Sequence, residues 1–429
     1  MKQNKVIIYG LLIIIILLEQ SAMACTIVSC SMNGEVFAAA NEDDFTPFSR
    51  IWFNPGTPER YGSVCFGAPD LQIGAAMNEY GLFYDFTAQY GIDPAKFELK
   101  HPYNDDVMFE LLGKCKTVKE ALIFLEAHNY TATSQVLIAD ATGNSVIIHV
   151  GVQVIKNGNY QINTNFDIAN LTTGNYACKR YDISDKLLSS AKSVSVPMLK
   201  NLLNLTHQEG ELSTQYSNIY DLKRGKIYVY LFHDFEHVYT IDLKEELSKG
   251  YRLEMLAYHF PISFAYETYM QNHPIYKKEK IMTEIKNSGL TETIDKYIHE
   301  LKTSKDSTLK VTLIDVGIQL IKNAHNQHQH GSMWEYFFAL ENGFKITHYT
   351  DTRIDAATEL FNALLQEKWN DIKLKNLMLE MGAYIDLLEN RDSMALKKYQ
   401  KLFTANASET LPITYKRSKK MLNRIKQGN

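Results

Sequence analysis

Hydrophobic and polar residues alternate with a period of two through much of the first 245 residues. The clearest case is the pair of segments "CTIVSCSM" and "EVFAAANED", at residues 25–32 and 35–43, which flank the dipeptide Asn33-Gly34. An Asn-Gly dipeptide between two alternating segments is a strong signal for a tight β-hairpin. The same pattern predicts further strand pairs at residues 72–86, 134–150 around Gly143-Asn144, 152–166 around Asn157-Gly158, and 216–243.

A second pattern, with apolar residues spaced three and four apart, lies between and after these hairpins. It predicts helices at residues 107–115, 117–128, 181–192 and 196–206. Antiparallel hairpins combined with helices in blocks predict an α+β fold in layers, rather than a parallel doubly wound sheet.

The chain changes character near residue 245, and after about residue 260 only helical periodicity remains. Amphipathic segments follow one another with short connections, at residues 274–289, 290–304, 309–324, 332–344, 354–369 and 374–390. Such a series predicts a helical domain of antiparallel helix pairs. We therefore expect an α+β domain over residues 25–255 and a helical domain over residues 260–429.

The first 24 residues have the pattern of a secretion signal. Lys2 and Lys5 precede an apolar run at residues 6–18, and the small-residue sequence "AMA" follows. The run is too short for a membrane span. Cleavage after Ala24 leaves Cys25 as the first residue of an exported chain, either periplasmic or secreted. A free α-amine has a pKa near 8, so it can take the thiol proton and act as the general base of its own residue.

A bacterial lipoprotein is the alternative interpretation of this boundary, with Cys25 acylated as a membrane anchor. A lipobox usually has Leu three residues before the cysteine, and this chain has Ala22, followed by Met23 rather than a small residue. The two interpretations exclude each other, because acylation of the amine and thiol removes both base and nucleophile.

Composition narrows the function further. The formal net charge of -4 argues against a nucleic-acid partner. The five cysteines include no CxxC pair, so a zinc or redox site of that type has no support, and their odd number leaves at least one thiol unpaired. Our candidate for this thiol is Cys25. The histidines of "HNQHQH", residues 325–330, have only loose ligand spacing and no fixed carboxylate beside them, so we predict no metal site and no cofactor.

Several segments resemble the N-terminal nucleophile (Ntn) hydrolases of the choloylglycine hydrolase and penicillin V acylase group, the linear amide C-N hydrolases. The matching segments, in chain order, are "ACT" at Cys25, "NED" at 41–43, "MNEYGL" at 77–82, "TNF" at 164–166, "CKRY" at 178–181 and "YSNIYDLKRGKIYVYLF" at 216–232. The resemblance covers residues 25 to about 250 and implies a four-layer αββα fold with the nucleophile on the first strand.

The resemblance also implies roles for four residues. Cys25 is the nucleophile, and Asp43 orients its amine. A bare carboxylate would favour the protonated amine and weaken the base, and Arg180 is placed to offset that charge. Asn165 donates to the oxyanion of the tetrahedral intermediate. Without the resemblance, the same residues fit ordinary roles at turns, strand ends and helix starts, and Asp44 is a rival to Asp43.

Two departures from the family pattern concern the substrate. Bile-salt hydrolases and penicillin V acylases usually carry an arginine where this chain has Ala40. The second oxyanion donor has no clear equivalent, and Tyr84, Phe86 and Thr87 are the candidates. With Phe45, the aromatic residues among them predict a pocket for an apolar acyl group, although each ring also fits a core position.

Together these observations predict hydrolysis of a small-molecule N-acyl amide outside the cytoplasm. Acyl transfer to an amine in place of water is an equally allowed variant of the same chemistry. Three roles for the helical domain stay open: it packs on the cleft, it binds a protein partner, or it is the functional part of the protein with the α+β domain as its scaffold.

Overall fold

The computed structural model describes residues 25–88, 107–128, 134–149, 151–174, 176–210, 212–304, 306, 308–329, 348–369, 371–404 and 409–427. The predicted signal segment and the helix expected at residues 332–344 lie outside these residues. The chain divides into two compact units, the first comprising most residues up to Pro274 and the second beginning at Ile275.

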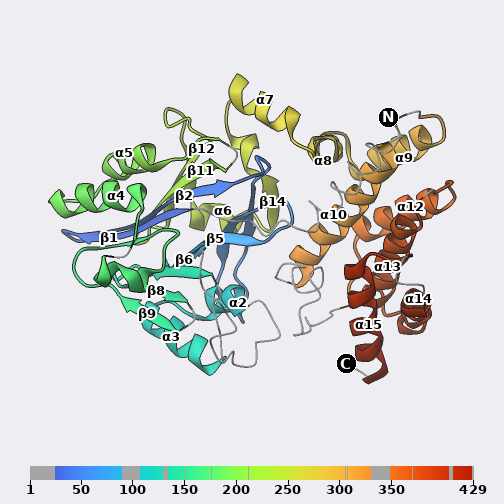
Figure 1. Ribbon diagram of the computed structural model, residues 1–429, viewed down its shortest axis with the longest axis horizontal. Coiled ribbons are helices and arrows are strands. Elements are labelled where there is room, and N and C mark those ends of the chain that lie inside the picture. The colour runs from blue at the N-terminus through green and yellow to red at the C-terminus, as the bar shows by residue number, and fades with distance from the viewer. Residues whose placement is uncertain are drawn as a thin grey trace. The chain divides into compact units, whose positions relative to one another are not determined.

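The first unit contains two antiparallel sheets (Figure 1). The six-stranded sheet has the order β10-β1-β2-β11-β12-β13. Its strands are β1 (Thr26–Met32), β2 (Glu35–Asp44), β10 (Tyr160–Asn163), β11 (Ser213–Asp221), β12 (Lys226–Leu231) and β13 (Tyr239–Asp242). β1 is therefore an interior strand, paired on one side with β2 and on the other with β10.

The eight-stranded sheet has the order β14-β3-β4-β5-β6-β7-β8-β9. Its strands are β3 (Arg50–Asn54), β4 (Ser63–Gly67), β5 (Ile73–Asn78), β6 (Phe83–Thr87), β7 (Gln135–Ala139), β8 (Ser145–His149), β9 (Val152–Ile155) and β14 (Arg252–Met255). Together with the helices, these antiparallel sheets confirm the α+β class predicted from the sequence.

The turn at Asn33-Gly34 forms the predicted hairpin between β1 and β2. Asn33 has φ 52° and Gly34 has φ 81°. Two central residues with positive φ are the requirement of a type I′ turn, whose twist matches that of the flanking strands. This turn sets the register in which Thr26 faces Asn41.

The prediction of a hairpin around Asn157-Gly158 is wrong. β9 pairs with β8 in the eight-stranded sheet, whereas β10 pairs with β1 in the six-stranded sheet. Gly158 does adopt a positive φ of 93°, so the dipeptide makes a turn. The turn carries the chain from one sheet to the other, because an Asn-Gly signal reports local backbone geometry and not the partner of the next strand.

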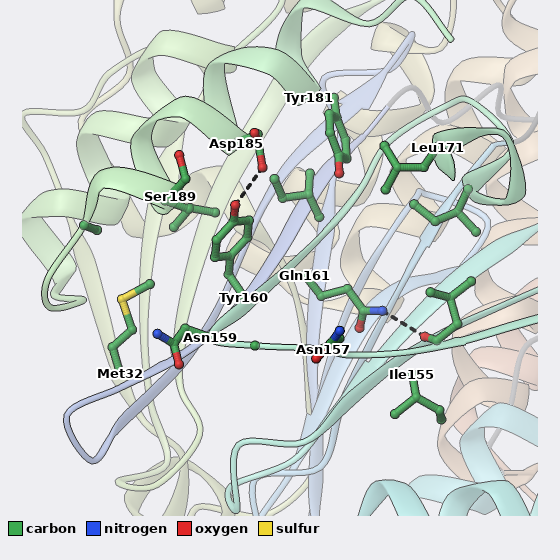
Figure 2. Close-up of a pocket in the computed structure, with 16 residues that line it drawn as sticks. Met32, Ile155, Asn157, Asn159, Tyr160, Gln161, Leu171, Tyr181, Asp185 and Ser189 are labelled. Carbon is green, nitrogen blue, oxygen red and sulfur yellow. Dashed lines mark hydrogen bonds between the residues drawn. The ribbon is translucent and has the colours of Figure 1, made fainter. Parts of the chain in front are cut away.

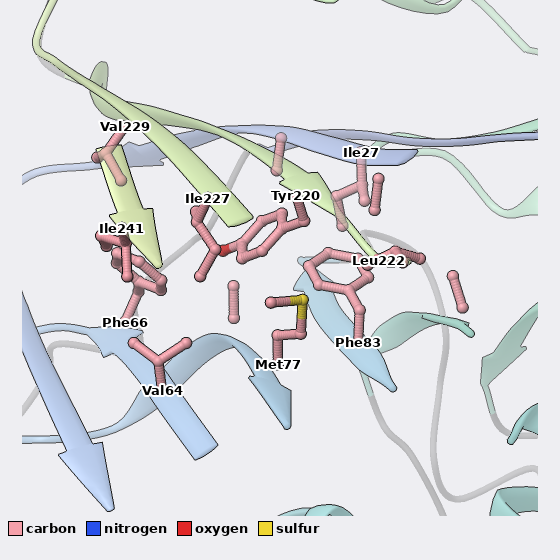
Figure 3. Close-up of a cluster of buried hydrophobic side chains, with 14 of the residues drawn as sticks. Ile27, Val64, Phe66, Met77, Phe83, Tyr220, Leu222, Ile227, Val229 and Ile241 are labelled. Atoms are coloured by element: carbon pink, nitrogen blue, oxygen red, sulfur yellow. The ribbon is translucent and has the colours of Figure 1, made fainter. Parts of the chain in front are cut away.

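Alternation along the strands places buried apolar side chains in separate clusters on the inner and outer faces of the sheets. The inner faces of both sheets pack together through residues that include Ile27, Phe66, Met77, Phe83 and Tyr220 (Figure 3). Every second residue points to the opposite face, so each sheet has a second apolar face to cover. Burying these faces against helices supplies much of the hydrophobic stabilisation of the unit.

Helices cover both outer faces (Figure 1). α2 (Val107–Lys114) and α3 (Val118–Ala127) pack on the eight-stranded sheet, around Tyr84 and Val136. α4 (Lys179–Ser190) and α5 (Val196–Thr206) pack on the six-stranded sheet, around Val28 and Ile219. The other helical segments among the described residues of this unit are η2 (Ile168–Thr173), α6 (Leu243–Ser248), η3 (Leu256–His259) and α7 (Phe264–Asn272).

The motif "MNEYGL" builds the turn between β5 and β6. The amide of Asn78 donates to the carbonyls of Leu112 and Cys115 and accepts from the backbone N–H groups of Tyr80 and Leu82. Gly81 has φ 78°, and a Cβ there would lie 2.0 Å from a backbone oxygen of the β11–β12 turn. This part of the family-like pattern therefore has a structural role.

The described residues of the second unit are mostly helical. The helices are α8 (Tyr276–Ser288), α9 (Leu290–Leu301), α10 (Leu309–Gln329), α12 (Thr352–Leu365), α13 (Ile372–Leu388), α14 (Asp392–Thr404) and α15 (Pro412–Gln427). Neighbouring helices pack against one another, as α10 does with α12 and α13 with α14. Within the described part of the chain, none of the helices combines the length and apolar character that crossing a membrane requires.

Candidate active site

Cys25 lies directly before β1, and its side chain is fully buried on the inner face of the six-stranded sheet. Its thiol donates to Oε2 of Glu42 at 3.4 Å. Burial raises the pKa of the Cys25 thiol well above its usual range, and the negative charges of Glu42, Asp85 and Asp43 raise it further. A hydrogen bond from the backbone of Asp43 acts in the opposite direction. The thiol is therefore protonated in this environment.

Arg180 connects the residues that the sequence predicted for the site. It lies in the first turn of α4, and Nη1 donates to the carbonyl of Cys25 at 3.1 Å and to the hydroxyl of Thr26 at 2.9 Å. The same nitrogen lies 3.4 Å from Oδ2 of Asp43, and Nη2 donates to Oδ1 of Asn165 at 2.8 Å. One guanidinium thus bridges Cys25, Asp43 and Asn165, as its planar fork of donors allows.

Asp43 is buried near the end of β2 and is held by several donors. Besides Arg180, it accepts hydrogen bonds from the hydroxyl of Thr214 and the side-chain amide of Gln208. Burial raises the pKa of Asp43 to about 7, and the Thr214 hydrogen bond and the Arg180 charge limit that rise. Its rival Asp44 instead accepts from the backbone N–H groups of the following turn.

Asn165 follows β10 and has a defined orientation. Arg180 can only donate, so the amide oxygen of Asn165 faces Arg180 and the nitrogen is directed elsewhere. That nitrogen, Nδ2, donates to the carbonyl of Ala88 at 2.8 Å. The donor end of Asn165 is therefore fixed by its contacts.

Two carboxyl groups beside Cys25 were missed by the sequence analysis. Glu42 points from β2 to the inner face, and Asp85 points toward it from β6 of the facing sheet; both are buried. Burial raises the pKa of each carboxyl, and the charge of Glu42 raises that of Asp85 well above its usual range. Asp85, whose pKa the neighbouring charge raises as well as burial, therefore favours its protonated form. The period of two along β2 could have indicated the inward direction of Glu42.

Of the four residues predicted to contact substrate, Tyr84 and Phe86 do not face Cys25. Tyr84 and Phe86 point to the other face of β6, toward α2 and α3, because Asp85 between them takes the inward position. Phe45 is 45% exposed. Thr87 is buried, and its hydroxyl lies 3.4 Å from Oδ1 of Asn163, two residues before Asn165.

A cavity of about 380 Å³ lies elsewhere in this unit, beside the edge strand β10 and between β9 and α4 (Figure 2). Its lining includes Leu171, Tyr181 and a hydrogen-bonded pair, Tyr160 and Asp185, whose atoms are 2.7 Å apart. None of the residues bridged by Arg180 lines this cavity.

Comparison with known proteins gives similarities of fold. No protein-family model matches the chain, and none of the curated proteins matches it. Among solved structures, a variant of conjugated bile acid hydrolase from Clostridium perfringens has 15% sequence identity and a TM-score of 0.45, over 56% of this chain and 99% of the other. Penicillin V acylase from Agrobacterium tumefaciens has 21% identity and a TM-score of 0.42, over 53% of this chain and 90% of the other. With TM-scores this low, we base the function proposed below on the side chains around Cys25.

Proposed function

We propose that this chain hydrolyses linear amide bonds of small N-acyl amides, with Cys25 as nucleophile and its α-amine, freed by removal of residues 1–24, as general base. The observation that carries the proposal is the bridge made by Arg180 between the Cys25 carbonyl, Asp43 and Asn165. A catalytic N-terminus has to be held by its neighbours, because a loose chain end does not maintain attack geometry.

The proposed mechanism divides the work among these groups. The amine takes the thiol proton, and the sulfur attacks the amide carbonyl. Nδ2 of Asn165, which has a second N–H besides the one donated to Ala88, donates to the resulting oxyanion. The protonated amine then gives its proton to the leaving nitrogen, and water hydrolyses the thioester. Arg180 partly neutralises Asp43, which limits the tendency of that carboxylate to keep the amine protonated.

The carboxyl groups of Glu42 and Asp85 disfavour a negative charge on the Cys25 sulfur. A thiolate beside Glu42 is unfavourable in the chain that still carries residues 1–24, as the raised pKa of Cys25 indicates. Cleavage would add an ammonium group close to this charge. We therefore infer that the thiol becomes reactive only when the new N-terminus is formed.

We propose the four-layer αββα arrangement of Ntn hydrolases for the first unit, with the domain limits expected from the sequence, and export by the N-terminal segment. The buried, hydrogen-bonded side chain of Cys25 favours the nucleophile over the lipoprotein alternative, because an acylated sulfur has to reach the membrane. Transfer of the acyl group to an amine instead of water remains the variant of the same chemistry, and the helical unit is a candidate for binding a protein partner.

The test begins with the intact mass of the mature protein from its native host. A chain that starts at unmodified Cys25 is the expected result, whereas a diacyl or triacyl adduct would refute the proposal. The mature protein is then assayed on a panel of N-acyl amides that differ in acyl length and amine.

Cys25→Ser is expected to lower kcat by about a hundredfold or more. The serine hydroxyl is a weaker nucleophile than the thiol, and its proton is harder for the α-amine to remove. Cys30→Ser is the matched control, because Cys30 lies in β1, the strand that follows Cys25, is equally buried and points to the opposite face. Full activity of Cys25→Ser, or of a chain extended at its N-terminus, contradicts the mechanism.

A further inference from the structure

We propose that His207, Glu209 and His233 form a binding site for one divalent transition metal ion, of which Zn²⁺ is the probe. His207 follows the last residue of α5, Glu209 lies two residues later, and His233 follows β12. Each of the three offers a ligand atom, and these atoms lie within 4.8 Å of one another. The chain brings them together from two segments that are distant in sequence.

The hydrogen bonds of the two histidines fix which nitrogens can bind a metal. Nδ1 of His207 lies 2.6 Å from the carbonyl of Asn204, and Nε2 of His233 lies 2.9 Å from the carbonyl of Gln208. A carbonyl only accepts, so each of these nitrogens carries the proton and the other nitrogen of each neutral ring has a lone pair. Metal-binding histidines commonly donate their second N–H to a backbone carbonyl in this way, which orients the ring.

The backbone before His233 supports the placement of its ring. Phe232 has a φ of 54°, which is unusual for a bulky residue and carries an energetic cost. Its ring stacks on that of His233 with the centroids 4.1 Å apart. His233 is thereby turned toward the end of α5, where the centroid of its ring is 4.7 Å from that of His207.

Glu209 completes a ligand set that suits zinc. Two imidazoles and a carboxylate leave a fourth tetrahedral position for water or another ligand, with metal–ligand bonds of roughly 2.0–2.2 Å. Oε1 of Glu209 lies 3.6 Å from Nε2 of His207, and the Glu209 side chain is 79% exposed. A rotation of this exposed side chain can therefore bring its oxygen to bonding distance without moving the fold.

The histidines of the "HNQHQH" segment are arranged differently. The ring of His325 contacts the hydroxyl of Tyr384, and His328 contacts Asp351 at 2.9 Å. They lie on one helix but have separate partners, and His330 lies outside the described residues. His325 and His328 are therefore not part of the proposed metal site.

The proposed metal site is one residue from a contact of Asp43. Gln208, between two of the ligands, donates its side-chain amide to Asp43, and its backbone N–H donates to the hydroxyl of Thr214. Its carbonyl accepts from His233. A metal bound to His207, Glu209 and His233 would restrain Gln208 from both sides. We therefore expect metal binding to stabilise the hydrogen bond from the Gln208 side chain to Asp43. This link to activity rests on the proposed function, whereas metal binding itself does not.

The test is isothermal titration of Zn²⁺ into the full mature chain without an affinity tag. We expect one Zn²⁺ per chain. Glu209→Gln, at an exposed position, should weaken binding by about tenfold or more, and His233→Ala by about a hundredfold. His237→Ala is the matched control, because His237 lies in the same turn, is exposed and pairs with Asp234 instead; its affinity should be unchanged.

A second measurement keeps the test valid if the His233→Ala protein does not fold. Titration of Co²⁺ into the wild type should give the intense visible absorption of a four-coordinate ion, and Glu209→Gln should alter that spectrum while its circular dichroism stays the same. Absence of one-to-one binding, or equal binding by Glu209→Gln, His233→Ala and wild type, overturns the proposal. Because both titrations are made without substrate, these results are independent of whether the chain hydrolyses amides.

Discussion

Replacement of Glu42 by glutamine should make the Cys25 thiol more acidic. In the wild type the thiol donates to Glu42 at 3.4 Å, inside a cluster of buried carboxyl groups. Glutamine has nearly the same shape, but it carries no charge and its amide can donate to a thiolate. The variant therefore removes an unfavourable charge and leaves the packing between the sheets intact.

The size of the effect follows from Coulomb's law. At 3.4 Å and an effective dielectric constant of about 20, two unit negative charges repel by about 5 kcal/mol, which corresponds to roughly three to four pKa units. The change should be smaller than this, because Asp85 remains nearby and becomes easier to ionise once Glu42 is neutral. We expect the pKa of Cys25 in E42Q to fall by at least about one unit.

The assay is the ultraviolet absorbance of the thiolate as a function of pH, with the Cys25→Ser protein subtracted so that only this thiol contributes. It needs no reagent to enter a buried site. Glu35→Gln is the control, because Glu35 lies on the same strand but pairs with Arg224 at the surface. An unchanged or higher Cys25 pKa in E42Q would refute the electrostatic account of the site.

Four further predictions follow from other contacts. Arg180→Lys keeps the charge but not the fork of donors, so kcat should fall by roughly ten- to a hundredfold; an effect on KM alone in steady-state kinetics would contradict this. Burial raises the pKa of Asp43 from 3.8 to about 7, so its contribution to stability is lost as pH rises through that range. Asp43→Asn should therefore gain stability relative to wild type between about pH 4 and pH 7 in urea unfolding. Gly81→Ala should lower the free energy of unfolding by more than about 2 kcal/mol, because of its positive φ and the nearby backbone oxygen. Burial lowers the pKa of His325 to about 3, so its contribution is present above 6.5 and lost as pH falls; the stability advantage of wild type over His325→Gln should shrink between pH 7 and pH 4.

The fold was predictable where a signal was local. Alternation and the Asn33-Gly34 dipeptide gave the β1–β2 hairpin, and the periodicity of three and four gave helices such as α5 and α13. β3 and β4 were not predicted, since they are short, fully buried runs without alternation. The error around Asn157-Gly158 has a related cause, because sheet membership depends on distant strands that a turn dipeptide does not report.

The candidate site shows the same division between local and distant information. The motifs indicated Asp43, Asn165 and Arg180, and the structure places all three within one set of hydrogen bonds with Cys25. Asp85 could not be found in this way, because its approach to Glu42 requires two sheets to face each other. The proposed substrate contacts at Tyr84 and Phe86 depended on the phase of β6, and a shift of one residue reverses the face of every side chain in a strand.

The position of β1 within its sheet has a consequence for the order of folding. Ile27 pairs with Asn163 on one side, and β2 pairs with β11 as far as Asp221 on the other. The strand that follows Cys25 pairs early with β2, but it acquires its second neighbour, β10, only after the chain has been synthesised as far as residue 163. Non-local pairings of this kind make folding slow, and an incomplete chain exposes unpaired strand edges in the meantime. The N-terminal cysteine, although made first, is thus among the last parts of the unit to reach its final surroundings, and chain fragments that end before residue 163 should be prone to aggregation.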